Sequence, residues 1–383
     1  MANTLKVDLY WDLRSTIPDR HTGVGKHIIE VLRGLMADGE MDLRIWIASD
    51  QCTLWQEQSA AFGWTDLPVL KLPFSNKTGR LLAGLGFTYA AKRMCPGRDL
   101  VYSPMEILLP IKGIPSINTI HGIPCFEQSP LRSSHYYSWR YRYERLKQRY
   151  FFYRSRQRCS TSFVVSDYLK NRLIHNFGWP PNQLHTVYNG ADAVFFENNT
   201  LFDVNITTHE ESFHLLQVGG ANAFDGAPAL LAIASYLADN HPQIKIHIAG
   251  DRHEAPWEHQ LRRLPNIVWL GFLSSEALRN EMRRARALIY VPTAESFGII
   301  GVEAMAVGLP ILAMRTASLP EVLGDAAAWI DPQVSESIEN GLLVTCFNPT
   351  RRQQLIKLGQ NRAKRYQWPN VVEKVKNALR ARI

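Results

Sequence analysis

Two carboxylates, Glu295 and Glu303, flank a glycine turn in the segment 287–325. The apolar run ALIYV before them predicts a buried parallel strand. Ile299 to Val307 carries a helical pattern, which Gly308-Leu309-Pro310 ends. A helix that starts at this turn directs free N–H groups at a bound ligand, an arrangement that suits a phosphate. Because Glu303 falls about one turn into the helix, it can reach a hydroxyl of the same ligand. The pattern therefore fits a diphosphate joined to a ribose.

The wider segment is similar to a known family signature. The Glu-x7-Glu spacing, the ESFG turn, Gly-Leu-Pro and the downstream SLPEVLGDAAAWIDP resemble the donor-binding region of retaining glycosyltransferases of family 4, which have the GT-B fold. The resemblance implies that Glu295 lies beside the transferred sugar and that Glu303 binds the ribose hydroxyls. It implies that the diphosphate is held by Ser296, Phe297, Gly298, Ile299 and Ile300. The alternative is an ordinary βαβ unit with two solvent-exposed glutamates.

Strand-like and helix-like stretches alternate along the whole chain, which is typical of doubly wound parallel sheets. Strand candidates occupy 7–11, 43–49, 99–103, 116–121, 161–166, 184–189, 213–220, 244–250, 266–271, 287–291, 309–314 and 326–330. We expect an α/β protein of the GT-B type, with two Rossmann-like domains that face across a cleft. Residues 1–195 would form the acceptor domain and 205–365 the nucleotide-sugar domain, with a polar linker over 197–212. The resemblance implies that 366–383 pack back on the first domain.

Composition narrows the class of protein. The 383 residues are 46% hydrophobic and 20% charged, an ordinary globular composition. We find no apolar run of about 18 residues, so no spanning helix is predicted, and the first residues lack a signal-peptide pattern. Five scattered cysteines without a CxxC pair argue against a disulfide framework and a zinc site. They favour a reducing compartment, and we expect a cytoplasmic protein.

The formal charge of +8 is unevenly distributed. Residues 1–190 hold 24 Lys and Arg against 15 Asp and Glu, whereas 191–383 hold 19 against 20. A basic half predicts an anionic partner, and no nucleic-acid motif is present. Residues 136–158 interleave aromatic and basic side chains with one acid, Glu144. Such a helix suits an anionic membrane surface, here the inner face of the membrane. A plain amphipathic helix with its aromatic side chains in the core is the alternative.

Two further segments of the first half are candidate ligand contacts. Gly23 and Gly25 lie just before a predicted helix, where glycines allow close approach of the backbone to a ligand. Their place matches the family's first glycine loop, although any tight turn could hold them. His121 ends the strand 116–121, and the carboxyl ends of parallel strands are where open sheets bind ligands. The resemblance implies that His121 contacts hydroxyls of the donor sugar, but relatives commonly have Asp where this chain has Gly122.

The first loop of the second sheet departs from the family pattern. Relatives carry an Arg and a Lys there that clamp the diphosphate, and this chain has neither between Gly219 and Ala234. We expect Gly220 and Asn222 to face the donor, with Arg252 from a neighbouring loop as a substitute cation. A different donor, or loss of activity, would also fit this departure.

Together these features predict a retaining hexosyltransferase with His121 and Glu295 as catalytic residues. It would move a sugar from a nucleotide-sugar to a glycan or polyprenyl-diphosphate-linked acceptor, in assembly of cell-surface polysaccharide or glycolipid. We expect no cofactor and no metal, since no Asp-x-Asp pair is present. The alternatives are a non-catalytic sugar-nucleotide-binding homologue, and another GT-B enzyme such as a phosphorylase or an epimerase. The donor sugar, its base and the acceptor are not specified.

Overall fold

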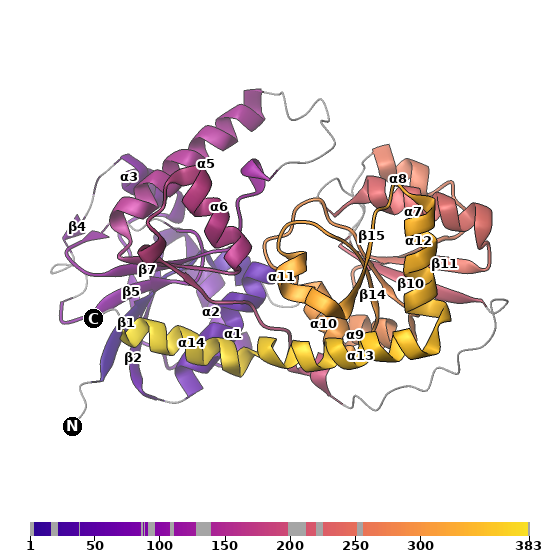
Figure 1. Ribbon diagram of the computed structural model, residues 1–383. Helices are drawn as coiled ribbons and strands as arrows, with labels where there is room; N and C mark the ends of the chain where they lie inside the picture. Colours follow the sequence, from indigo (N-terminus) through magenta and orange to yellow (C-terminus); the bar gives the residue numbers. More distant parts are fainter. Residues whose placement is uncertain are drawn as a thin grey trace. The chain divides into compact units, whose positions relative to one another are not determined.

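The structure is a computed structural model. It describes residues 4–16, 22–37, 39–85, 87, 89–90, 96–107, 111–127, 139–197, 212–219, 225–250 and 256–381. The contacts within the chain divide it into two compact units. Unit 1 comprises Met1–Phe126, Ser134–Asn189 and Trp368–Ile383, and unit 2 comprises Glu127–Ser133 and Gly190–Gln367. Each unit contains one doubly wound parallel sheet (Figure 1), as the alternating sequence pattern predicts.

The sheet of unit 1 has seven strands in the order β3-β2-β1-β5-β7-β8-β9, with all neighbours parallel. The chain moves outward from β1 to β3 and then returns to the other side of β1 as β5, so the strand order reverses between β1 and β5. The strands are β1 Leu5–Leu9, β2 Met41–Ile47, β3 Val69–Lys71, β5 Leu100–Ser103, β7 Ser116–Ile120, β8 Thr161–Val164 and β9 Leu184–Thr186; β4 Tyr89–Ala90 pairs separately with β6 Ile111–Lys112.

Helices cover both faces of this sheet, which explains why β5, β7 and β8 are buried along their whole length. They are α1 Gly23–Ala37, α2 Cys52–Phe62, α3 Asn76–Leu85, α5 Trp139–Arg158, α6 Asp167–Phe177 and α14 Trp368–Arg380, with short turns η1 Leu13–Thr16, η2 Ser49–Gln51, η3 Pro124–Phe126 and η5 Pro181–Gln183.

The last helix, α14, packs against α1 in unit 1 (Figure 1). Its apolar side chains Trp368, Val371, Val375 and Leu379 are buried in the same core as β1 and α1. At Gly34 in α1 a Cβ atom would lie 2.4 Å from a methyl group of Val372, so only glycine lets these two helices approach so closely.

The sheet of unit 2 has six parallel strands in the order β12-β11-β10-β13-β14-β15, and here the order reverses between β10 and β13. The strands are β10 Phe213–Val218, β11 Ile244–Ala249, β12 Ile267–Gly271, β13 Leu288–Tyr290, β14 Ile311–Met314 and β15 Ala327–Ile330. The helices are α7 Ala227–Asn240, α8 Pro256–Leu261, α9 Ser275–Arg284, α10 Ile299–Val307, α11 Leu319–Leu323, α12 Ser335–Leu342 and α13 Pro349–Ala363, with short segments η6 Ala193–Phe196, η7 Gly324–Ala326, η8 Leu343–Phe347 and η9 Lys364–Tyr366.

All twelve predicted strands overlap observed ones, and the predicted helix 299–307 coincides with α10. The structure adds β3, β4 and β6, which are two or three residues long and too short to show a periodic pattern. Residues 198–211 of the predicted linker lie outside the described residues. In the part of the chain that the structure describes, no helix combines the length and apolarity needed to span a bilayer.

Candidate active site

The strand order of unit 2 reverses between β10 and β13, so the loops after these strands diverge at the carboxyl edge of the sheet. Open α/β sheets bind ligands at such a switch point. The loop after β13 leads into α10, and the loop after β10 leads into α7. The start of α7 lies close to the end of β13, because a Cβ at Gly226 would lie 1.8 Å from the carbonyl oxygen of Val291.

The start of α10 is shaped by Gly298, which has φ +100°. A Cβ there would lie 3.0 Å from Leu319 and 3.2 Å from the hydroxyl of Tyr290, so glycine is needed both for conformation and for space. No side chain among the described residues caps this helix. In the described part of the chain, no side-chain cap therefore occupies the first-turn N–H groups of α10, whereas the Phe297 N–H just before the helix donates to Glu295.

Glu295 is held from both its side chain and its backbone. The Tyr290 hydroxyl donates to Oε2 over 2.8 Å, and the Phe297 N–H donates to Oε1 over 3.3 Å. The carbonyl oxygen of Glu295 accepts from the N–H and the hydroxyl of Ser318, at 3.2 and 2.8 Å. Beside it, Ala317 has φ +48°, a left-handed conformation that costs about 1 kcal/mol or more for a non-glycine residue. These hydrogen bonds hold the strained turn and orient the carboxylate.

Burial sets the protonation of this pair of residues. It raises the pKa of Glu295 above the usual value, while the Tyr290 hydroxyl and the neighbouring amides pull the pKa back down. Burial, followed by the charge of Glu295, holds the pKa of Tyr290 well above its usual value, so the phenol remains a donor. Glu295 is thus a carboxylate with few water contacts and increased basicity, fixed in one orientation.

Glu303 is fully buried in α10, where its neighbours Val302, Ala304 and Met305 are buried as well. A buried carboxylate is costly unless polar groups surround it. Burial raises the pKa of Tyr290, and the charges of Glu295 and, least, of Glu303 raise it further.

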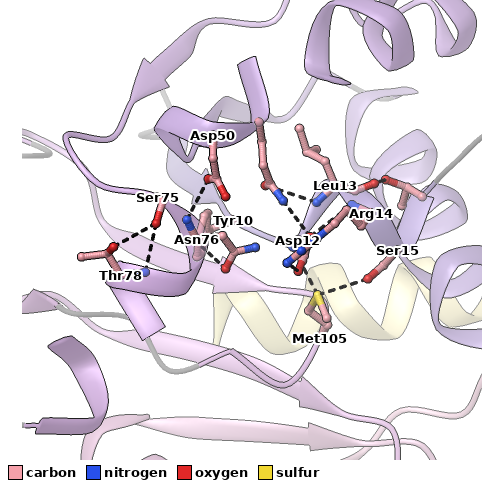
Figure 2. Close-up of polar contacts among 12 residues, drawn as sticks. Tyr10, Asp12, Leu13, Arg14, Ser15, Asp50, Ser75, Asn76, Thr78 and Met105 are labelled. Carbon is pink, nitrogen blue, oxygen red and sulfur yellow. Dashed lines mark hydrogen bonds and ion pairs between the residues drawn. The ribbon is translucent and has the colours of Figure 1, made fainter. Parts of the chain in front are cut away.

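Unit 1 reverses its strand order between β1 and β5, and polar side chains fill the loops after these strands (Figure 2). Asp12 accepts from Arg14 Nε and Nη2 at 2.9 and 2.6 Å and from Gln51 Nε2 at 2.7 Å. The Asp12 N–H points at the Met105 sulfur, 3.3 Å away. Burial favours a higher pKa for Asp12, but the bonds from Arg14 and Gln51 outweigh it and the pKa is lowered. Asp12 is therefore a buried carboxylate.

His121 lies at the carboxyl end of β7, as predicted, and is half-buried. Its Nε2 is 2.9 Å from the Pro104 carbonyl oxygen. A carbonyl only accepts, so Nε2 carries the proton and Nδ1 keeps the lone pair. The N–H groups of His121 and Gly122 both donate to Oε1 of Glu106. Glu106 thus fixes the backbone at the strand end, in the loop that follows β5.

A second imidazole packs edge-on against the first. The His27 ring lies 4.8 Å from that of His121, nearly perpendicular to it, and its Nδ1 is 2.8 Å from Oδ1 of Asn189. Burial, with a smaller contribution from His121, holds the pKa of His27 well below its usual value. A lowered pKa favours the neutral form of His27.

The predicted glycine loop forms the start of α1. Thr22 caps the helix, because its hydroxyl oxygen accepts the Gly25 N–H over 3.2 Å. Gly25 is buried and Gly23 is exposed. The cap occupies the amide of Gly25, so Gly23 is the more accessible of the two predicted contacts.

The predicted site residues thus fall into three groups. One group shares the β13 loop and the first turns of α10: Glu295, Ser296, Phe297, Gly298, Ile299, Ile300 and Glu303. Within this group the Phe297 ring is buried and packs edge-on against Tyr366 at 5.5 Å, and the Phe297 N–H donates to Glu295, so this residue supports the turn. The second group, in unit 1, is Gly23, Gly25 and His121. The third group lies outside the described residues: Gly220, Asn222 and Arg252.

Sequence reasoning missed the polar groups at the unit 1 switch point and beside His121: Asp12, Arg14, Gln51, Glu106 and His27. The sequence places Asp12 after β1 and Glu106 after β5. That the strand order reverses at these two strands, and that both acids therefore lie at the switch point, becomes known only with the fold.

Comparisons with known proteins agree with this architecture. Residues 198–362 match the family described as glycosyl transferases group 1, and 21–195 match glycosyltransferase family 4. An uncharacterized glycosyltransferase of Methanocaldococcus jannaschii, MJ1607, is 23% identical over 229 residues. The O-antigen chain mannosyltransferase B of Escherichia coli is 24% identical over 226 residues. In both cases the match covers 57% of this chain and 59% of the relative, so the chain spans little more than half the length of either.

Among solved structures, Anabaena Alr3699/HepE in complex with UDP and glucose has a TM-score of 0.68 at 17% identity, over 98% of this chain and 99% of that one. At this identity the likeness concerns the fold, which consists of two Rossmann-like parallel-sheet domains of the GT-B type. The two family matches together cover most of the chain, since one ends at residue 195 and the other begins at residue 198. The chain therefore belongs to the group 1 glycosyltransferases of family 4 and has the GT-B fold.

Proposed function

We propose that this protein transfers a hexosyl group from a nucleotide-sugar donor to a glycan or lipid-linked acceptor, with retention at the anomeric carbon. The observation that carries the proposal is the placement of Glu295 just before α10 and of Glu303 within it, at a helix start that no side chain among the described residues caps and that lies at the switch point of unit 2. The names of relatives support the class of reaction, since one is a mannosyltransferase of O-antigen chains and a structural neighbour holds UDP and glucose.

In this proposal the start of α10 binds the diphosphate. Its N–H groups and the positive end of the helix dipole stabilise the negative charge that develops on the departing group. Glu303 accepts from the ribose hydroxyls. Glycosyl transfer passes through an oxocarbenium-like transition state, and the oriented Glu295 carboxylate supports that positive charge. In unit 1, His121 presents its Nδ1 lone pair to a sugar hydroxyl, because Nε2 is engaged by Pro104.

The test begins with the donor. A thermal-shift screen against UDP-, GDP- and ADP-sugars identifies the nucleotide that stabilises the folded chain. The selected donor is then incubated with candidate acceptors, and NMR of the product reports the anomeric configuration. Transfer with retention supports the proposal. A donor that binds but is neither transferred nor hydrolysed would instead indicate a non-catalytic binding protein.

We propose further that the acceptor is presented at an anionic membrane on the cytoplasmic side. The observation that supports this membrane contact is the surface of α5, where exposed apolar side chains recur at alternating intervals of four and three residues. They are Trp139, Tyr143, Leu146, Tyr150 and Tyr153. This spacing places them on one helical face, and two of them, Trp139 and Leu146, are 79% and 68% exposed.

Cations border this apolar stripe on both sides. Exposed Arg142 and Arg149 lie on one flank and Lys147 on the other, whereas the opposite face buries Phe152 in the unit. Two copies of the stripe would bring like charges together along both edges, which disfavours self-pairing. An anionic headgroup layer matches the charges and accepts the aromatic rings at the interface.

A further inference from the structure

Three side chains in unit 2 from separate parts of the sequence lie at one point, away from the candidate active site. They are His214 in β10, His247 in β11 and Glu281 in α9. His247 Nδ1 lies 2.6 Å from Glu281 Oε1, and His214 Nε2 lies 3.0 Å from the same oxygen. Leu216 is the strand partner of His247, so His214 is its diagonal neighbour on one face of the sheet. Glu281 of α9 reaches both rings from above that face.

The set of donor atoms suits a divalent transition-metal ion. Imidazole nitrogens and a carboxylate oxygen are ligands of Zn²⁺ at about 2.0–2.2 Å. A tetrahedral ion with such bonds holds its ligand atoms about 3.3 Å apart. The three candidate atoms here all lie within 4.8 Å of one another, so side-chain movements on the order of 1 Å would bring them around an ion. Hard ions such as Mg²⁺ prefer oxygen and do not fit this set.

One ring must turn to complete the site. The two imidazoles are stacked, with centroids 3.9 Å apart and planes 12° apart, so their lone pairs do not yet converge. Among the described residues, no hydrogen-bond partner lies in line with the buried Nε2 of His214, although Oε1 of Glu281 is close. The Cβ–Cγ torsion of histidine has a broad energy profile. A turn about this bond in His214 directs Nε2 at an ion beside the Glu281 carboxylate.

We propose that His214, His247 and Glu281 bind one Zn²⁺ ion, with water in the fourth position. The ion would join α9 to strands β10 and β11. His214 is the second residue of β10, whereas the donor-binding loops follow the carboxyl ends of β10 and β13. The site is therefore separate from the proposed transfer chemistry and serves the structure. Arg284, a cation close enough to act on His214, opposes the charge of the ion, and we expect micromolar rather than tighter affinity.

The helix that the ion would fix also holds the first residues of unit 2. Ser275 donates to Oδ2 of Asp192 over 3.1 Å, and Arg279 donates to the carbonyl oxygen of Glu197 over 2.7 Å. Tying α9 to the sheet would therefore also stiffen the segment around η6. The scattered cysteines that argue against a zinc site in the sequence do not bear on this one, because no cysteine takes part.

The test uses the full chain without an affinity tag, stripped of metal by chelation. Calorimetric titration with Zn²⁺ should show one equivalent bound, and Zn²⁺ should raise the melting temperature whereas Mg²⁺ should not. Co²⁺ should give a visible absorption band that Zn²⁺ abolishes. His247→Gln and Glu281→Gln should each weaken Zn²⁺ binding by at least about tenfold, the range seen when metal-site groups are altered.

His241→Gln is the matched control, because His241 pairs with Glu339 over 2.8 Å elsewhere in unit 2, and among the described residues this pair has no third metal-ligating side chain beside it. It should bind Zn²⁺ as the unaltered chain does. The proposal is overturned if no single equivalent binds at micromolar Zn²⁺, or if folded His247→Gln and Glu281→Gln proteins bind Zn²⁺ like the control. Far-ultraviolet circular dichroism establishes folding, and retained nucleotide binding keeps this result distinct from failure of the transferase proposal.

Discussion

The two switch points share a topology and differ in what occupies them. In unit 1, the acids that follow β1 and β5 are already bonded within the unit: Asp12 pairs with Arg14 and Gln51, and Glu106 accepts from backbone N–H groups after β7. In unit 2, the first amides of α10 have no capping side chain among the described residues. Topology thus determines where a ligand can bind, while the side chains determine which ligand. Unit 1 offers polar side chains that are already paired, and unit 2 offers a helix start without a capping side chain among the described residues, which suits an anion.

The sharpest test of this contrast is Glu295→Gln. We expect kcat to fall by about 10²–10³, the loss typical of removing one preorganised charge-stabilising group. Affinity for the nucleoside diphosphate should remain nearly unchanged, because the proposal places Glu295 beside the sugar and not beside the nucleotide. Steady-state kinetics and calorimetry on the same protein measure both. A variant with full kcat would remove Glu295 from the chemistry.

The next largest effect concerns the basic surface of unit 1. Changing Arg142, Arg145 and Arg149 together to Gln should weaken binding to anionic vesicles by ~3 kcal/mol, at about 1 kcal/mol for each cation near the surface. Co-sedimentation measures the loss, and added salt should mimic it, since exposed charges are screened over about 10 Å at 0.1 M.

The matched control for this change removes three exposed cations of unit 2, by substituting Lys357, Lys364 and Arg365 with Gln. Vesicle binding should then persist. Equal binding to neutral and anionic vesicles, or no binding to either, would leave α5 as a plain surface helix.

Glu303→Ala tests the nucleotide contact of unit 2. Loss of a charged hydrogen bond should weaken nucleotide affinity by about 1–3 kcal/mol. Because Glu303 is fully buried, Glu303→Gln accompanies it as a variant of the same size. Exposed Glu336, changed to Ala, controls for the loss of one negative charge. Unchanged affinity by calorimetry in folded protein would contradict the whole assignment of the α10 start.

Asp12→Asn asks whether the paired charges of unit 1 serve the acceptor. The variant cannot accept both bonds from Arg14, so we expect the acceptor KM to rise by up to about tenfold, ~1.4 kcal/mol, with donor affinity unchanged. Asp50→Asn is the control, since this neighbouring acid accepts only the Asn76 N–H among the contacts drawn (Figure 2). An equal effect of both variants, or weakened donor binding, would break the division of roles between the units.

Tyr290→Phe should produce the smallest effect, a shift in pH dependence. The pKa of Glu295 is raised by burial and partly restored by the Tyr290 hydroxyl, which favours the ionised form. If the ionised carboxylate is required, activity is lost as pH falls through that pKa. Removing the hydroxyl raises the pKa further, so the acidic limb of the kcat/KM profile should move to higher pH. Tyr236→Phe, whose hydroxyl bonds Glu339, should leave the limb in place.

Much of this molecule could be predicted from local patterns. The strand runs predicted both doubly wound sheets, because burial on two faces leaves short apolar stretches in the sequence. The bounds of α10 and the positions of Glu295 and Glu303 follow from one continuous segment, in which the turn, the helix start and both acids lie within a few residues. Very short strands such as β3 left no such pattern.

The support of those residues could not be predicted in the same way. Tyr290 was part of a predicted strand. Its hydroxyl meets Glu295 and lies close to Gly298 only because the loop after β13 turns back over the strand, and the sequence pattern does not show this turn. The mutual pairing of Asp12, Gln51 and Met105 depends on β1, β2 and β5 being neighbours in the sheet, although they are far apart in sequence.

The sequence by itself thus determined the class of fold, the bounds of α10 and the basic character of the first half, since each is encoded locally or in composition. The tertiary structure alone decided which distant side chains meet: Asp12 with Gln51 and Met105, and His214 with His247 and Glu281. The physical reason is that strand order and register create these contacts, and neither is carried by the periodicity of a single element.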